Sequence, residues 1–205
     1  MCSSDLVLQR VVHTTQLVNI QHLKQVHASI VHTNLTSSIV PKKKELKTMI
    51  KFLDVSMQRI NTINPKLIPS AIRVFEKCIQ NKIPIYIVWG NRSVSEQETI
   101  FRYGRTIPGQ ILTSHRGGYS PHNYGLALDF CLSFNTELMS WEDVYPRLYW
   151  RNKWLKVVRY FEEEGWESGW RSPSFEPGHV QNLLGNNIIQ LYEQNLNRSD
   201  GVKDL

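Results

Sequence analysis

The central segment of the chain reads Ser120-Pro-His122-Asn-Tyr-Gly125-Leu-Ala127-Leu-Asp129 and continues as an apolar run to residue 134. Proline, asparagine and glycine in its first half indicate a turn, and the apolar run predicts a buried β-strand. Asp129 lies inside that strand. Because burying a carboxylate without a partner costs several kcal/mol, we expect Asp129 to pair with a metal ion or an arginine. Candidate arginines are Arg92 and Arg105.

Helices are predicted on both sides of this strand, over 65–81, 95–104, 141–164 and 187–196. The first and third show apolar residues at helical spacing. Ser95 followed by Glu98 matches a capping box at the start of the second helix. Pro146 marks a bend or a first turn near the start of the third helix.

Further strands are predicted at 83–89 and on either side of a loop at 167–178, and residues 105–125 read as a long loop. Helices and strands therefore do not alternate as they do in a doubly wound fold. We expect an α+β fold with a small antiparallel sheet flanked by helices.

The distribution of charge divides the chain in two. Residues 1–48 carry six Lys or Arg against two acids, whereas residues 49–205 carry eighteen against sixteen. We therefore expect a basic N-terminal extension of unknown role over 1–48 and one globular domain over 49–205. The near-neutral balance of the domain and the lack of a recognised nucleic-acid motif argue against nucleic-acid binding.

Three cysteines, at positions 2, 78 and 131, show no paired spacing, so neither a disulfide framework nor a Cys-rich zinc site is expected. No stretch approaches 18 consecutive apolar residues, so we expect no transmembrane helix. The N-terminus also lacks the pattern of a secretory signal.

Two segments carry the residues of a hydrolytic metal site. The first contains His122 and Asp129, and the second reads Phe175-Glu176-Pro-Gly-His179. Catalytic zinc commonly takes three N or O protein ligands and keeps one position open. Two histidines and one carboxylate meet that demand, and Glu176 stands three residues before His179, where a turn could bring both into one pocket as ligand and base.

These motifs resemble a family of zinc peptidases. The family includes D-alanyl-D-alanine carboxypeptidases, D,D-dipeptidases and phage L-alanyl-D-glutamate endolysins, and it has the hedgehog/D,D-peptidase fold. Its Ser-x-His-x-x-Gly-x-Ala-x-Asp pattern is intact from Ser120 to Asp129. The resemblance covers about residues 52–181 and includes the stretches Gly90-Asn-Arg92-Ser, Glu96-Gln97, Tyr103-Gly-Arg-Thr, Pro108-Gly and Gly165-Trp.

The resemblance implies that His122, Asp129 and His179 bind Zn²⁺ and that Glu176 is the general base. It also implies that Arg92 binds and polarises the substrate carbonyl, in agreement with the fixed donors and permanent charge of a guanidinium. Ser120 and Gln97 are candidate substrate-binding residues, although a serine before a proline is equally typical of a turn.

The chain departs from the family pattern at a few positions. Trp89 and Asn91 replace the Ser and Tyr usual around the arginine, so the pocket wall near Arg92 is expected to differ. The base is Glu176 instead of Asp. His115 falls outside the pattern, and we read it as a loop residue near the cleft.

We therefore expect a monomeric zinc metallopeptidase that hydrolyses peptidoglycan stem peptides, cutting between L-alanine and D-glutamate. A D,D-carboxypeptidase or dipeptidase of the same family is the nearest alternative, and a non-catalytic zinc-containing wall-binding module is a third. We expect synthesis in the cytoplasm, followed by action on the wall after release, as for phage lysins, or on wall peptides inside the cell.

Overall fold

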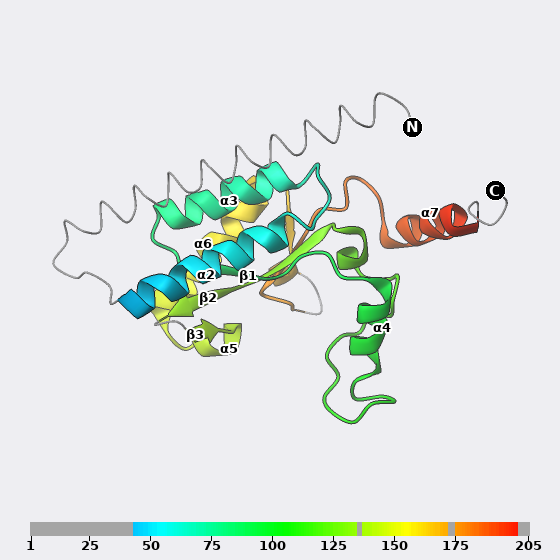
Figure 1. Ribbon diagram of the computed structural model, residues 1–205, viewed down its shortest axis with the longest axis horizontal. Helices are drawn as coiled ribbons and strands as arrows, with labels where there is room; N and C mark the ends of the chain where they lie inside the picture. The colour runs from blue at the N-terminus through cyan, green and yellow to red at the C-terminus, as the bar shows by residue number, and fades with distance from the viewer. Residues whose placement is uncertain (1–42, 135–136, 172–174, 201–205) are drawn as a thin grey trace. The chain divides into compact units, whose positions relative to one another are not determined.

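The computed structural model describes residues 43–134, 137–171 and 175–200, which form helices around one antiparallel sheet (Figure 1). The α-helices are α2 (Lys43–Ile60), α3 (Ile68–Gln80), α4 (Val94–Arg102), α5 (Trp141–Val144), α6 (Leu148–Glu163) and α7 (Ile188–Asp200). The strands are β1 (Ile85–Trp89), β2 (Ala127–Phe134), β3 (Glu137–Met139), β4 (Glu167–Ser168) and β5 (His179–Gln181). Two short 3₁₀ helices are η1 (Pro121–Tyr124) and η2 (Gly169–Arg171). This arrangement confirms the α+β prediction.

Strand β2 is the centre of the sheet. The strands of the sheet follow the order β1-β2-β5-β4, and β3 pairs with the C-terminal end of β2. Every pairing is antiparallel. Asp129 therefore has a neighbour on each side, namely Trp89 of β1 and His179 of β5.

One face of β2 packs against α6. Phe130 lies 4.9 Å from Trp154 and 6.0 Å from Phe161, measured between ring centroids. All three side chains are buried. Since successive side chains of a strand point to opposite faces, Asp129 projects away from this apolar layer. Phe130 thus belongs to the core, whereas Asp129 belongs to the site on the other face of β2.

Helix α3 packs beside α6, and α2 contacts the backbone of β1. Arg73 of α3 forms an ion pair with Glu164, and Trp166 donates a hydrogen bond to Ser70. Ser56 of α2 accepts a hydrogen bond from the backbone of Ile87, and Arg59 donates to its carbonyl. The free backbone groups of an edge strand are therefore partly satisfied by α2.

The predicted break at Pro146 is confirmed, but the capping box of α4 is formed by other residues than predicted. Helix 141–164 is interrupted at Pro146, between α5 and α6. The capping box of α4, however, is formed by Ser93 and Glu96 rather than by Ser95 and Glu98. Both pairs have the required spacing, and the earlier one is used because Ser93 is the residue with extended backbone at the helix start.

The described residues from Lys47 onward belong to one compact unit. The boundary expected at residue 49 falls inside α2, whereas residues 1–42 of the predicted extension lie outside the described part of the chain. None of the helices described is long and apolar enough to cross a bilayer.

Candidate metal centre and cleft

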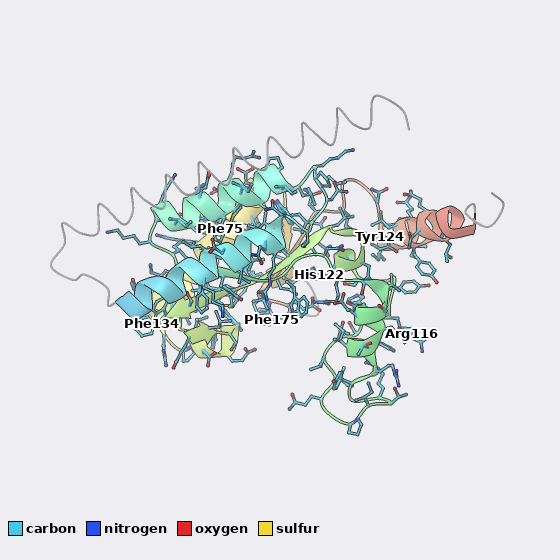
Figure 2. All side chains as sticks on the ribbon, viewed as in Figure 1. Phe75, Arg116, His122, Tyr124, Phe134 and Phe175 are labelled. Carbon is cyan, nitrogen blue, oxygen red and sulfur yellow. The ribbon has the colours of Figure 1, made fainter. Side chains whose placement is uncertain are left out.

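His122 is placed by the short helix η1, immediately before β2. Its ring is buried, and Nδ1 lies 2.7 Å from the carbonyl oxygen of Gly90. A carbonyl can only accept a hydrogen bond, so Nδ1 carries a proton and Nε2 is the nitrogen turned toward Asp129. Nε2 lies 3.2 Å from Oδ2 of Asp129. Figure 2 shows His122 between the sheet and α4.

His179 is the first residue of β5 and faces Asp129 across the strand pair. Its Nδ1 lies 3.0 Å from Oδ1 of Asp129, and its Nε2 lies 3.2 Å from Oε1 of Gln181. Gln181 in turn donates from Nε2 to Glu167 on β4. This bond orients the Gln181 amide with its oxygen toward His179, so that Nε2 donates and Nδ1 faces the carboxylate.

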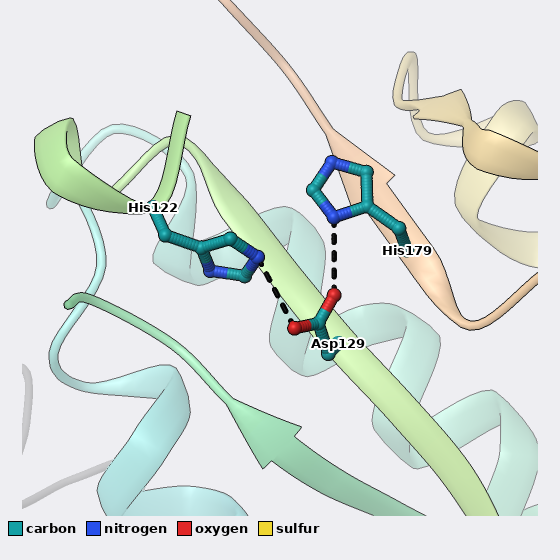
Figure 3. A group of neighbouring side chains, drawn as sticks. All are labelled: His122, Asp129 and His179. Atoms are coloured by element: carbon teal, nitrogen blue, oxygen red, sulfur yellow. Dashed lines mark hydrogen bonds and ion pairs between the residues drawn. The ribbon is translucent and has the colours of Figure 1, made fainter. Parts of the chain in front are cut away.

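The three side chains meet at one point (Figure 3). A ligand atom from each of His122, Asp129 and His179 lies within 4.8 Å of the other two. The donor chemistry fits a metal ion, because each imidazole has its second nitrogen engaged by an oxygen acceptor and turns the remaining nitrogen to the same carboxylate.

The charges in this group support one another. Burial alone would raise the pKa of Asp129, but hydrogen bonds and charge interactions with His122 and His179 hold it well below its ordinary value. Burial lowers the pKa of His179, but the hydrogen bond and charge of Asp129, the hydrogen bond to Gln181 and the charge of Glu176 together raise it above its ordinary value. Asp129 is therefore a carboxylate at neutral pH, the form that binds metals.

Arg92 lies beside Asp129, in the segment that follows β1. Its Nη2 is 3.6 Å from Oδ2 of Asp129, and its Cζ is 4.9 Å from the centre of the Trp89 ring. Of the two arginines considered for Asp129, Arg92 is thus the neighbour, whereas Arg105 donates to the carbonyls of Phe101 and Thr113. The buried Nε of Arg92 has no partner among the described residues.

Gln97 supports Arg92 from α4. Its side chain is completely buried, and Oε1 accepts a 2.8 Å hydrogen bond from Nη1 of Arg92. Its Nε2 donates to the carbonyl of His115. Contact between Gln97 and substrate stays a prediction, and in this structure both polar ends of the buried side chain are engaged inside the protein.

Glu176 is held close to His179 by a tight turn. The backbone of His179 donates to the carbonyl of Glu176, whose own N–H donates to Gly169. A side chain at Gly169 would place Cβ 2.3 Å from the carbonyl oxygen of Glu176, so glycine allows this close approach. The carboxylate of Glu176 contributes to raising the pKa of His179, as a nearby negative charge does.

All the predicted site residues except Gln97 line one cleft of about 1230 Å³. The lining includes apolar residues, among them Trp89, Ile100 and Leu112, and polar residues of β4 and η2, among them Arg171. Ser120 and His115 also line the cleft.

Sequence reasoning missed Gln181 and Glu167, which orient His179. The signal was available in part, since residues 179 and 181 are two apart in a strand and so share one face. Glu167 reaches Gln181 because β4 pairs with β5. This pairing belongs to the tertiary structure and is not encoded in the local sequence.

Comparison with known proteins agrees with this site. A sequence model of the family described as D-alanyl-D-alanine carboxypeptidase matches residues 113–182. Peptidoglycan L-alanyl-D-glutamate endopeptidase CwlK of Bacillus subtilis (strain 168) is 40% identical over 88 residues, which are 42% of this chain and 53% of CwlK. The chain thus spans about half the length of this relative.

A solved structure, the L-Ala D-Glu endopeptidase ChiX of Serratia marcescens, superposes with a TM-score of 0.42 and 21% identity, over 62% of this chain and 85% of ChiX. The segment 113–182 contains His122, Asp129, Glu176 and His179. The family model confirms the resemblance inferred from the motifs over residues 113–182, and this segment carries the sequence pattern of the D-alanyl-D-alanine carboxypeptidase family.

Proposed function

We propose that this protein is a zinc-dependent peptidase that hydrolyses the stem peptides of peptidoglycan, between L-alanine and D-glutamate. One observation carries the proposal. Two imidazoles and a carboxylate converge within 4.8 Å in a cleft that also contains Glu176 and Arg92. A hydrolase needs such a combination of metal ligands, a base and a fixed cation in one place.

His122, Asp129 and His179 would hold the metal. Two neutral nitrogens and one carboxylate oxygen suit Zn²⁺ better than the hard ions Mg²⁺ or Ca²⁺, which prefer oxygen ligands. When bound, the ion supplies Lewis acidity, which makes a water molecule acidic near neutral pH.

Glu176 and Arg92 supply the remaining chemistry. Glu176 removes a proton from the attacking water and returns it to the leaving amine. Arg92 donates to the substrate carbonyl, where negative charge develops during attack. Because Gln97 and Asp129 already hold its Nη1 and Nη2, the guanidinium needs little rearrangement to act. Ser120 lines the cleft beside His122 and would contact the bound peptide.

The size of the cleft favours an endopeptidase. Its volume of about 1230 Å³ exceeds the ~300–1,000 Å³ of typical small-ligand sites. A D,D-dipeptidase needs only a closed pocket for a short substrate, whereas an endopeptidase must admit a stem peptide with chain on both sides. The name of CwlK points to the same bond.

The test is release of new amino termini from purified peptidoglycan, with zinc content measured on the same samples. We expect the wild type to release D-glutamate termini, and Glu176→Gln to bind zinc normally but cleave at least ~100-fold more slowly, the usual lower contribution of a general base. The control is Glu163→Gln, which alters a carboxylate paired with Lys77 on the surface of α6.

Two results would contradict the proposal. A wild type that binds zinc but releases no termini from several wall types indicates a non-catalytic wall-binding module. Termini of D-alanine instead of D-glutamate indicate the D,D-peptidase alternative.

A further inference from the structure

A second, smaller hollow of about 260 Å³ opens beside the main cleft. It is lined by Trp89, Arg92, Ser95, Glu96, Thr99 and Ile100. Three of these residues, Trp89, Arg92 and Ile100, also line the main cleft, so the two hollows adjoin at Arg92. We propose, on the basis of the function proposed above, that this hollow binds the N-acetylmuramic acid ring to which the stem peptide is attached.

Trp89 forms the aromatic wall of the hollow. It is 44% exposed, although it is the last residue of β1 and pairs with Asp129 of the central strand. The pairing of β1 with β2 is irregular between Ile87 and Trp89, and such a bulge re-aims a side chain. The indole is thereby presented to solvent beside Arg92 instead of being packed into the core.

Helix α4 supplies the polar wall. Ser95 and Thr99 lie one turn apart and are exposed, as is Glu96. Thr99 donates its hydroxyl proton to the carbonyl of Ser95, so its oxygen remains able to accept. The backbone N–H and the hydroxyl of Ser93 both donate to Oε2 of Glu96. Oε1 of Glu96 can therefore accept from another donor.

An aromatic face next to hydroxyl and carboxylate acceptors matches the chemistry of a pyranose. A sugar ring has apolar C–H faces that pack on an indole, and hydroxyl edges that donate to oxygen acceptors. The hollow, at about 260 Å³, is smaller than the ~300–1,000 Å³ of drug-sized ligand sites. It therefore suits one ring and not an oligosaccharide.

The attachment point of the stem peptide identifies which sugar this is. Arg92 lines both hollows. In peptidoglycan a lactyl group and L-alanine, together about two residues or ~7 Å of extended chain, separate the muramic ring from the bond to D-glutamate. A carbonyl held at Arg92 thus places the ring in the adjoining hollow. The D-alanine end of the stem lies several residues farther away.

The test compares two substrates: the free peptide L-Ala-γ-D-Glu-diaminopimelate, and the same peptide with N-acetylmuramic acid on its amino end. We expect the wild type to show about tenfold higher kcat/KM for the muramoyl peptide, the gain from one well-packed ring. Thr99→Phe fills the hollow while leaving Trp89 and Arg92 unsubstituted, and should abolish this preference. Thr99→Ala leaves the hollow open and is the matched control, and Trp89→Ser removes the aromatic wall.

A binding measurement gives a readout independent of catalysis. N-acetylmuramoyl-L-alanine should bind the wild type and Thr99→Ala in calorimetric titrations, and Thr99→Phe about tenfold more weakly. Equal kcat/KM for the two substrates in the wild type, or a preference that survives in Thr99→Phe and Trp89→Ser, would overturn the sugar site while leaving the proposed peptidase intact. Failure of the wild type to cleave either substrate would instead refute the proposed function.

Discussion

Asp129 has three cationic or potentially cationic neighbours and can satisfy all of them because its two oxygens point in different directions. Oδ1 meets His179, and Oδ2 meets both His122 and Arg92. The two histidines account for most of the lowering of its pKa. A carboxylate in this position stays ionised as pH falls, so the ligand set keeps its negative charge under mildly acidic conditions.

In the proposed metal site, Gln181 is not a ligand but holds Nε2 of the proposed ligand His179. We predict that Gln181→Leu lowers zinc affinity by about 10–100-fold, the usual effect of removing a group that orients a ligand. Competition with a chromogenic chelator measures this directly, without any assay of activity.

Asn182→Ala is the matched control for Gln181→Leu. Asn182 is the next residue, and its side chain donates to Gly165 instead of to a ligand. If Gln181→Leu binds zinc as tightly as Asn182→Ala does, then β5 alone orients His179 and the Gln181 hydrogen bond is dispensable.

At the scale of elements, the junction of β2 with β5 carries the site, since it brings together Asp129 and His179. Gly178 precedes β5, and its carbonyl accepts from the backbone of Phe130. A Cβ there would lie 2.6 Å from the carbonyl oxygen of Phe130. The two strands can therefore approach only because residue 178 has no side chain.

We predict that Gly178→Ala lowers the free energy of unfolding by ~1–3 kcal/mol, as overpacking does. It should also weaken zinc binding, because β5 must shift relative to Asp129. Denaturant unfolding of the metal-free protein and chelator competition measure the two effects.

Gly185→Ala is the control for Gly178→Ala, because it introduces backbone strain without a steric clash. Its Cβ would meet nothing within 4 Å, but its φ of +80° imposes strain of about 1 kcal/mol. This variant should lose some stability and keep normal zinc affinity. Equal zinc affinity in Gly178→Ala and Gly185→Ala would contradict the proposed role of Gly178.

At the scale of the whole molecule, the core buries two thiols on different elements. Cys78 on α3 and Cys131 on β2 are both buried, and desolvation raises the pKa of each from 9.0 to about 12. Unfolded thiols ionise near pH 9, whereas the folded ones resist ionisation. The unfolded state thus binds fewer protons in this window, and stability falls as pH rises from about 9 to about 12.

We therefore predict that both cysteines resist alkylation at pH 8 in the native protein and react on unfolding. Peptide mapping by mass spectrometry after iodoacetamide treatment assigns the label to each position. The free energy of unfolding, measured by denaturant titration, should decrease between pH 9 and pH 11 less steeply in Cys78→Ala than in the wild type. Rapid native labelling of Cys78 would show that α3 is not stably packed.

We also propose that residues 49–205 form the folding unit. The residues of α2 that support β1, including Ser56 and Arg59, all follow Met49. A chain that starts at Met49 should keep the zinc affinity of the full chain, with a thermal midpoint lower by no more than a few degrees. An aggregated or unfolded product would show that residues 1–48 belong to the domain.

Much of this molecule follows from local sequence. The apolar run of β2, the helical spacing in α3 and α6, and the break at Pro146 are set by neighbouring residues, and the structure agrees with each. The grouping of His122, Asp129 and His179 was likewise predicted, because a buried carboxylate needs partners and the motif spacing supplied two. The helices and strands depend on residues close in sequence, whereas the grouping of the site depends on the requirement that a buried carboxylate be paired.

Other features were decided only by tertiary structure. Gln97 lies in a motif beside Arg92, yet the packing of α4 against the 113–118 loop buries it as a support for Arg92. Gln181 became an orienting residue because β4 pairs with β5 and carries Glu167 to it. The hollow beside Trp89 depends on a bulge in one strand facing one side of a helix. In each case residues distant in sequence determine which way a side chain points, and no local pattern encodes that direction.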